Sequence, residues 1–217
     1  MTRGKVLIVS KTRMKEGRVC VGGIDLTNNT SVRLLDHNGH HEQQETCPFN
    51  IRDLWEVEYV KDNRRPMPHL HEDVDFFDRR QTGVLPKEVK MVDILQEHGI
   101  PICTGSIYNV FDGLIKSTDN GSMYICQPDV PSFSTCFWIC DKSIKTTPNR
   151  EKGGFRCRYQ DDQHRYGLSI PYQGLDMPVQ YIREGTLIRL SLAHWWSGQT
   201  LDAAPRCYLQ VSGYYEQ

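Results

Sequence analysis

The chain has 217 residues, of which 38% are hydrophobic, and its formal net charge is -1. This length fits one large domain or two modules of about 100 residues each, and the near-neutral charge excludes a global basic field that draws the protein to nucleic acid. The first apolar run is too short for a signal peptide and no stretch reaches the roughly 18 apolar residues of a membrane span, so we expect a cytoplasmic protein that contacts no membrane.

Consecutive strands are predicted over residues 1–84. Apolar patterning marks strands at residues 5–10, 18–25, 30–36 and 54–60, and the turn residues Gly17 and Asn28-Asn29 separate the first three. A polar stretch, residues 36–50, interrupts this meander. Residues 69–77 are expected to be extended at a sheet edge, because two prolines just before them break regular pairing.

Helical signals appear in residues 85–118. Val89, Val92 and Leu95 repeat at a spacing of three between Pro86 and Gly99, and apolar residues recur at helical spacing from 107 to 115. These two patterns predict two short helices.

Strand patterns resume after this insert. The segments are SMYIC, FSTCFWIC, FRCRY, HRYGLSIP, GTLIRLSL and RCYLQVSGYY. Two small β-barrels or one split sandwich would accommodate such a chain, and we prefer the two barrels. We therefore predict a mainly β fold with a first barrel at residues 1–84, a helical insert at 85–118 and a second barrel at 119–217.

The first hairpin is the most basic part of the chain, with seven Lys and Arg against two Asp and Glu in residues 1–35. Residues 17–22 have the G-x4-G spacing of a phosphate loop, but Gly23 and Ile24 replace the required Lys and Ser or Thr, which excludes that kind of nucleotide hydrolase. The remaining hypothesis is a phosphate-binding strand face, against the alternative of a solvated surface. Its members are Lys11, Arg13, Arg18 and Arg33.

A second candidate surface lies in the carboxyl-terminal half. Aromatic and basic residues alternate in FRCRY and continue across the next turn, as in proteins that stack bases and bind the backbone of a single strand. The same alternation is expected if the aromatic residues are core and the arginines are merely solvated. At least one of two adjacent tryptophans is expected to face outward. The candidate residues are Arg156, Arg158, Tyr159, Arg165, Trp195 and Trp196.

The sequence HLHEDVD is the most enzyme-like cluster. In a strand, His69, His71 and Asp73 share one face and could ligate a metal for a hydrolase, but a polar edge strand is the favoured interpretation. The eight cysteines contain no CxxC pair, which indicates reduced thiols, and no GxSxG or HExxH motif is present. We expect neither a metal nor a cofactor, and a non-enzymatic role is favoured over catalysis.

Several segments resemble a known family. The run VLIVSKTRMKEGRVCVGGID, followed by SVRLL, LWEVEYV and PHLHEDVDFF, is similar to the amino-terminal half of the dual OB domain-containing proteins of prokaryotes. FRCRY, HRYGLSIP, GTLIRLSL and RCYLQVSGYY are similar to their second barrel. The resemblance implies two tandem OB barrels and a role in nucleic-acid binding or as an accessory in defence-like gene neighbourhoods. Its amino-terminal motif residues here are Ser10, Lys11, Arg13, Gly17, Arg18, Cys20 and Arg33.

The leading functional hypothesis is therefore a non-enzymatic accessory protein that binds single-stranded DNA or RNA through basic and aromatic residues on OB-like barrels. The second is a module that binds a protein partner or senses a small ligand or nucleotide. A metal-dependent hydrolase is the third.

Overall fold

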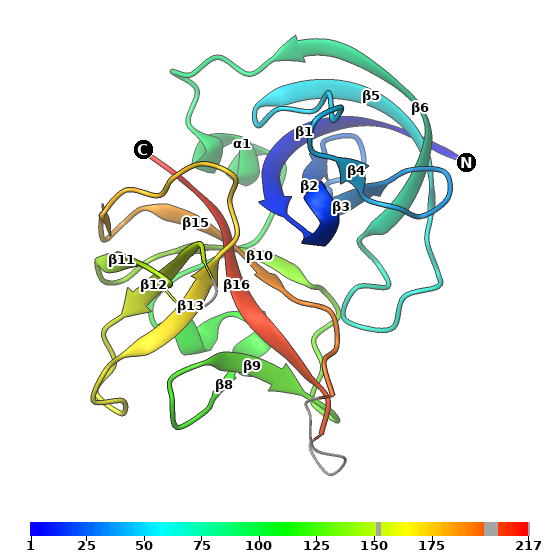
Figure 1. Ribbon diagram of the computed structural model, residues 1–217. Helices are drawn as coiled ribbons and strands as arrows, with labels where there is room; N and C mark the ends of the chain where they lie inside the picture. Colours follow the sequence, from blue (N-terminus) through cyan, green and yellow to red (C-terminus); the bar gives the residue numbers. More distant parts are fainter. Residues whose placement is uncertain (151–152, 198–203, 217) are drawn as a thin grey trace. The chain divides into compact units, whose positions relative to one another are not determined.

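Strands make up most of the regular structure in the computed structural model, which describes residues 1–150, 153–197 and 204–216. The chain forms two compact units, Met1–Pro101 and Ile102–Glu216 (Figure 1). The mainly β fold predicted from the sequence is confirmed. The division between the units lies within the predicted helical insert.

The first unit is a closed barrel of five strands. Around the barrel the order is β1, β2, β3, β6, β5 and back to β1, and only the β3–β6 pair is parallel. A five-stranded Greek-key barrel is the architecture of the OB fold. The strands are β1 (Thr2–Arg13), β2 (Arg18–Asp25), β3 (Thr30–Leu35), β5 (Asp53–Lys61) and β6 (Asp73–Val84), and the short β4 (Glu42–Gln43) pairs with β2.

Alternating apolar residues fill this barrel. Val19 and Val21 of β2 are fully buried, as expected, while Arg18 between the turn and Val19 is only half-buried. Gly23, the second glycine of the pair in β2, has a packing role, because a Cβ atom built on it would lie 2.4 Å from Cγ1 of Val6 on β1. The closed barrel thus brings β1 and β2 too close together for a side chain at this position.

One helix forms in the first unit within the segment predicted from Val89, Val92 and Leu95, but it begins after Val89. It is α1 (Met91–Glu97), which buries Met91 and Leu95. The helix predicted over residues 107–115 is wrong: two 3-10 turns, Ile107–Asn109 and Phe111–Gly113, occupy this segment. Positive φ angles at residues 111–113 interrupt helical geometry, and the apolar spacing instead buries the turns in the core of the second unit.

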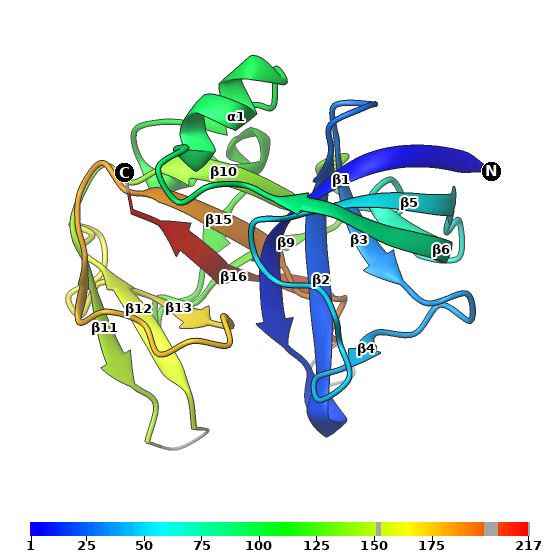
Figure 2. The same cartoon turned by 90° about the horizontal axis from the view of Figure 1, so that it is seen from above.

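The second unit is a curled sheet that forms half a barrel. Its strand order is β14-β11-β12-β13-β16-β15-β10-β7, and β9 pairs with β16 and β8. Figure 2 shows β11, β12 and β13 of this sheet side by side. The bounds are β7 (Ile102–Cys103), β8 (Lys116–Ser117), β9 (Met123–Cys126), β10 (Thr135–Ile139), β11 (Ile144–Pro148), β12 (Phe155–Tyr159), β13 (Leu168–Tyr172), β14 (Tyr181–Ile182), β15 (Leu187–Leu192) and β16 (Arg206–Tyr215).

The two units share one strand order. If β10 and β11, which follow each other along the chain, are counted as one bent first strand, then β12, β13, β16 and β15 follow in the order of β2, β3, β6 and β5. The β13–β16 pair is parallel, as is β3–β6. The second unit therefore has the strand order of the first without its complete hydrogen-bonded closure.

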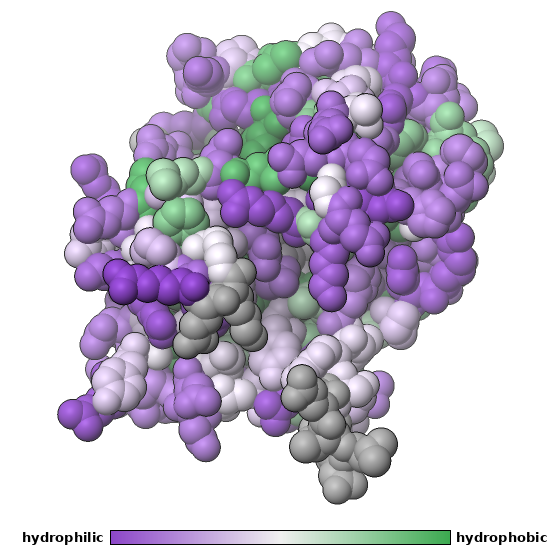
Figure 3. Space-filling model, viewed as in Figure 1, coloured by the Kyte–Doolittle hydropathy of each residue, from purple (hydrophilic) through white to green (hydrophobic). Residues whose placement is uncertain are grey.

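Hydrophilic residues cover most of the face shown in Figure 3, in agreement with a mean hydropathy of -0.54. Within the part of the chain that the structure describes, no helix is long and apolar enough to cross a membrane.

Candidate functional site

The outward side of β12, β13 and β16 carries the polar and aromatic residues of the second unit. On β12, Cys157 and Tyr159 are buried in the core, and Arg156 and Arg158 take the opposite side. The same alternation buries Leu168 and Ile170 of β13 and Cys207 and Leu209 of β16. It follows that Ser169, Pro171 and Tyr208 lie on the outward side with the two arginines.

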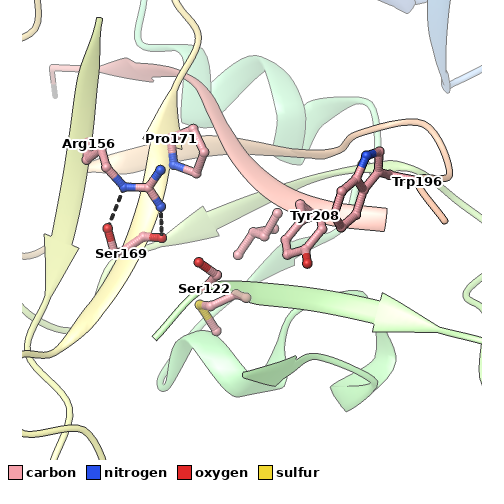
Figure 4. A pocket seen from close by; sticks show the side chains of 8 residues that line it. Ser122, Arg156, Ser169, Pro171, Trp196 and Tyr208 are labelled. Atoms are coloured by element: carbon pink, nitrogen blue, oxygen red, sulfur yellow. Dashed lines mark hydrogen bonds between the residues drawn. The ribbon is translucent and has the colours of Figure 1, made fainter. Parts of the chain in front are cut away.

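One part of this surface is a hollow of about 370 Å³, here called the aromatic hollow (Figure 4). The Trp196 ring, which is 52% exposed, lies 6.0 Å from the Tyr208 ring between centroids. Backbone hydrogen bonds in both directions between Trp196 and Arg206 fix the tryptophan beside β16. The hollow is lined by Ser122, Met123, Arg156, Ser169, Pro171, Trp196, Tyr208 and Leu209.

A second hollow of about 600 Å³, here called the polar hollow, adjoins the first. The two share Ser122, Arg156 and Ser169 in their linings, so Arg156 lies at the junction. Among the described residues that line the polar hollow there are three arginines and no carboxylate. The lining consists of Asn120, Ser122, Thr147, Pro148, Asn149, Arg150, Arg156, Arg158 and Ser169.

Arg156 is half-buried and held by a single residue of the neighbouring strand. Its Nε donates to Oγ of Ser169 at 2.5 Å, and its Nη2 donates to the Ser169 carbonyl at 2.6 Å (Figure 4). Within the described ranges no carboxylate oxygen lies within 4.0 Å of Arg156 or Arg158. Burial and the charge of Arg158 lower the pKa of Arg156.

Further aromatic contacts extend the surface along β16 and β9. The Tyr208 and Tyr124 rings are 6.0 Å apart, and the Arg206 guanidinium lies 4.2 Å from the Tyr124 centroid. The rings of Trp196, Tyr208 and Tyr124 thus follow one another, each tilted against the next, and the first two line the aromatic hollow.

The other predicted residues of the second unit lie elsewhere. Tyr159 is buried, and its hydroxyl donates to the Asp141 carboxylate at 3.0 and 3.1 Å, so it is a core residue and cannot stack on a base. Burial and Asp141 raise its pKa to about 12. Trp195 is half-buried and packs against the core, and Arg165 is exposed above the Tyr166 ring, outside the lining of both hollows. The expectation that one tryptophan faces outward is confirmed by Trp196.

The basic residues of the first hairpin bind the protein's own backbone. Lys11 Nζ donates to the carbonyls of Phe49 at 2.8 Å and Cys47 at 3.4 Å, and Arg18 Nη1 donates to the carbonyl of His41 at 3.2 Å. Arg13 is exposed at the end of β1. Lys11 and Arg18 therefore fasten the polar segment between β3 and β5 to the barrel.

Arg33 does not line an open groove, contrary to the prediction. Its side chain is buried and forms an ion pair of 2.8 Å with Asp73 of the parallel neighbour β6. Arg65 Nε lies 3.8 Å from the other oxygen of Asp73. Burial and then the charge of Arg33 lower the pKa of His41 to about 4, so this neighbouring imidazole adds no charge at neutral pH.

The histidine cluster does not form the expected strand face. Residues 69–72 form a turn, in which the Glu72 N–H donates to the His69 carbonyl at 3.1 Å, and β6 begins only at Asp73. His69 is buried, His71 is exposed, and Asp73 is paired with Arg33. Moreover, β6 pairs with β3 and β5 and is not an edge strand. In the described residues no group of three or more His, Cys, Asp and Glu could hold a metal.

The alternation in FRCRY identifies Arg156 and Arg158 correctly as outward residues. Tyr208 could have been found in the same way, because RCYLQV alternates too. Asn120, Ser122, Asn149 and Arg150 come from connections between strands, and no spacing in the sequence marks them.

Comparison with known proteins gave one family. The protein family described as the dual OB-containing domain matches residues 4–214 of the chain. No curated protein and no solved structure matches the chain.

Proposed function

The chain belongs to the dual OB-containing domain family, and from this premise we propose that it is a non-enzymatic protein that binds single-stranded DNA or RNA. The strand is held on the outward side of β12, β13 and β16, across the aromatic and polar hollows. OB folds that bind oligonucleotides use the face of their second and third strands with two adjacent connections. In the second unit these strands are β12 and β13, and the connections include Arg150 and Trp196.

The uncompensated charge of Arg156 is the observation that carries the proposal. A half-buried cation is costly unless an anion pairs with it, and Arg156 has no carboxylate within 4.0 Å in the described part of the chain. Its two hydrogen bonds to Ser169 fix the guanidinium and use two of its five N–H donors. The remaining donors suit the oxygens of a phosphate, which arginine binds in pairs.

Binding of a single strand also requires ring surface on which bases stack, and the aromatic hollow supplies it. Trp196 and Tyr208 present ring surface in the hollow that Arg156 also lines, and a base stacked on such a ring contributes about 1–3 kcal/mol regardless of its identity. Rings beside an arginine favour an unpaired strand over a duplex, whose bases are already stacked on one another.

The test is fluorescence anisotropy with a labelled single-stranded oligonucleotide at low salt. Because a hydrogen bond to a charged group contributes about 1.5–3 kcal/mol, Arg156→Ala is expected to weaken binding by about 10- to 100-fold. Arg165→Ala is the matched control, since it removes an exposed arginine of the same unit that lines neither hollow. No binding by the unchanged protein, or equal losses in the two variants, would contradict the proposal.

A further inference from the structure

We propose that the polar hollow is a subsite for the terminal phosphate monoester of the bound strand, so that the protein recognises a phosphorylated strand end. This inference rests on the proposed function and identifies which part of a single strand the site recognises. It follows from the charge of the polar hollow, from its donors and from its position next to the aromatic hollow.

The charge of the hollow exceeds what an internal phosphate requires. Arg150, Arg156 and Arg158 contribute three positive charges, and the other described lining residues are neutral. A phosphodiester within a strand carries one negative charge, whereas a phosphate monoester carries about 1.5 to 2 at neutral pH. A monoester therefore compensates more of this charge at a single position.

The donors that line the hollow come from different elements. Arg156 and Arg158 are two residues apart on the same side of β12, which places their Cα atoms about 7 Å from each other. Arg150 comes from the connection before β12, and Asn120 and Ser122 come from the segment before β9. A terminal phosphate offers three acceptor oxygens to such a set, one more than a diester offers.

The position of Arg156 connects the two hollows. It lines both, so a phosphate bound at Arg156 and Arg158 has the ring surface of Trp196 and Tyr208 in the adjoining hollow. The terminal nucleotide can thus place its phosphate in the polar hollow and its base in the aromatic one. The two volumes, about 600 and 370 Å³, fall within the range of pockets that take ligands of nucleotide size.

A variant at Arg158 tests this inference separately from the proposed function. Arg158 is exposed and lines the polar hollow but not the aromatic one, and its side chain forms no ion pair with another described residue. Its removal therefore takes away phosphate contacts without disturbing the fold. Arg183, which is exposed in the same unit and lines neither hollow, provides the matched control.

The experiment measures the Kd of three oligonucleotides of one sequence, ending in a 5′-phosphate, in a 3′-phosphate or in hydroxyls at both ends. One phosphorylated form is expected to bind at least about 10-fold more tightly than the hydroxyl form, a factor in line with one added charge-assisted contact. Arg158→Ala is expected to abolish this preference, so that the phosphorylated and hydroxyl forms bind the variant with equal Kd. Arg183→Ala is expected to keep the preference.

Equal Kd values for the three oligonucleotides would overturn the inference and leave the proposed function intact. A preference that survives in Arg158→Ala would overturn it too. Thymidine 5′-monophosphate serves as the competitor, and displacement by the free nucleotide at the Kd of the phosphorylated strand would assign the hollow to a mononucleotide instead. If none of the oligonucleotides binds, the proposed function itself fails and the inference falls with it.

Discussion

Arg33 and Arg156 both alternate with core residues along a strand, but they differ in what compensates their charge. Arg33 is 6% exposed and is paired with Asp73, whereas Arg156 is half-buried and is bonded to the neutral Ser169. The first arginine is thus part of the barrel's own ion-pair network. The second retains the capacity to bind an anion from outside.

This difference predicts a change in stability at Arg33. Replacing it with Met leaves the buried Asp73 carboxylate without its closest partner, and breaking a buried pair in this way costs about 3–5 kcal/mol. Burial already raises the pKa of Asp73, which Arg33 counteracts. Urea unfolding of Arg33→Met is expected to show this loss in the free energy of unfolding.

The matched control is Arg158→Met, an exposed arginine without a carboxylate partner in the described chain, which is expected to change stability by about 0.5 kcal/mol or less. An Arg33→Met protein as stable as the unchanged one would show that the ion pair contributes nothing to folding.

Local alternation was sufficient to predict the side on which Arg156, Arg158, Val19 and Val21 lie. It could not reveal that Arg33 meets Asp73, because that contact depends on a parallel pairing between strands 40 residues apart. The same limit applies to Tyr159, which alternation alone leaves open between core and surface, because its partner Asp141 belongs to another part of the unit. Site residues that lie in loops follow no repeating pattern in the sequence, so alternation cannot identify them.

At the scale of elements, the basic, glycine-containing segment of the sequence forms the β1–β2 hairpin of the barrel. Gly17 adopts a φ of 67° in the turn, and the following strand needs Gly23 because β1 approaches closely there. The hairpin is consequently a structural element of the barrel, and its cations Lys11 and Arg18 bind backbone carbonyls.

The close approach predicts that Gly23→Ala destabilises the protein. The new Cβ would lie 2.4 Å from Val6 Cγ1 and 3.2 Å from the Leu7 carbonyl oxygen, and overpacking of this kind costs about 1–3 kcal/mol. Gly83→Ala is the control, since a Cβ there has no described atom within 4 Å. Thermal or urea unfolding is expected to separate the two variants, and equal stability would contradict the packing role of Gly23.

The strands are easier to predict from the sequence than the turns that connect them. Alternation located strands such as β5, in which buried and half-buried residues alternate, and short apolar runs located β1 and β3, whose central residues are buried in succession. The turn at residues 69–72 and the 3-10 turns at 107–113 were missed, since local backbone geometry and burial determine them rather than a repeating period.

At the scale of the whole molecule, two units with one strand order differ in how they use their basic residues. In the first unit Lys11, Arg18 and Arg33 are engaged within the barrel, whereas in the second unit three arginines line one hollow. A formal net charge of -1 is compatible with binding because the positive charge is local. We therefore propose that the second unit, and not the first, binds the strand.

Photo-crosslinking tests this assignment most directly. A single-stranded oligonucleotide of about 12 nucleotides, within the site sizes of OB folds, carries one 5-iodouracil and is irradiated with the full chain. Peptide mass spectrometry is expected to find the adduct at Trp196 or Tyr208, with loss of the adduct in Arg156→Ala. Adducts confined to residues 1–101, or no specific adduct in the unchanged protein, would contradict binding of a single strand by the second unit.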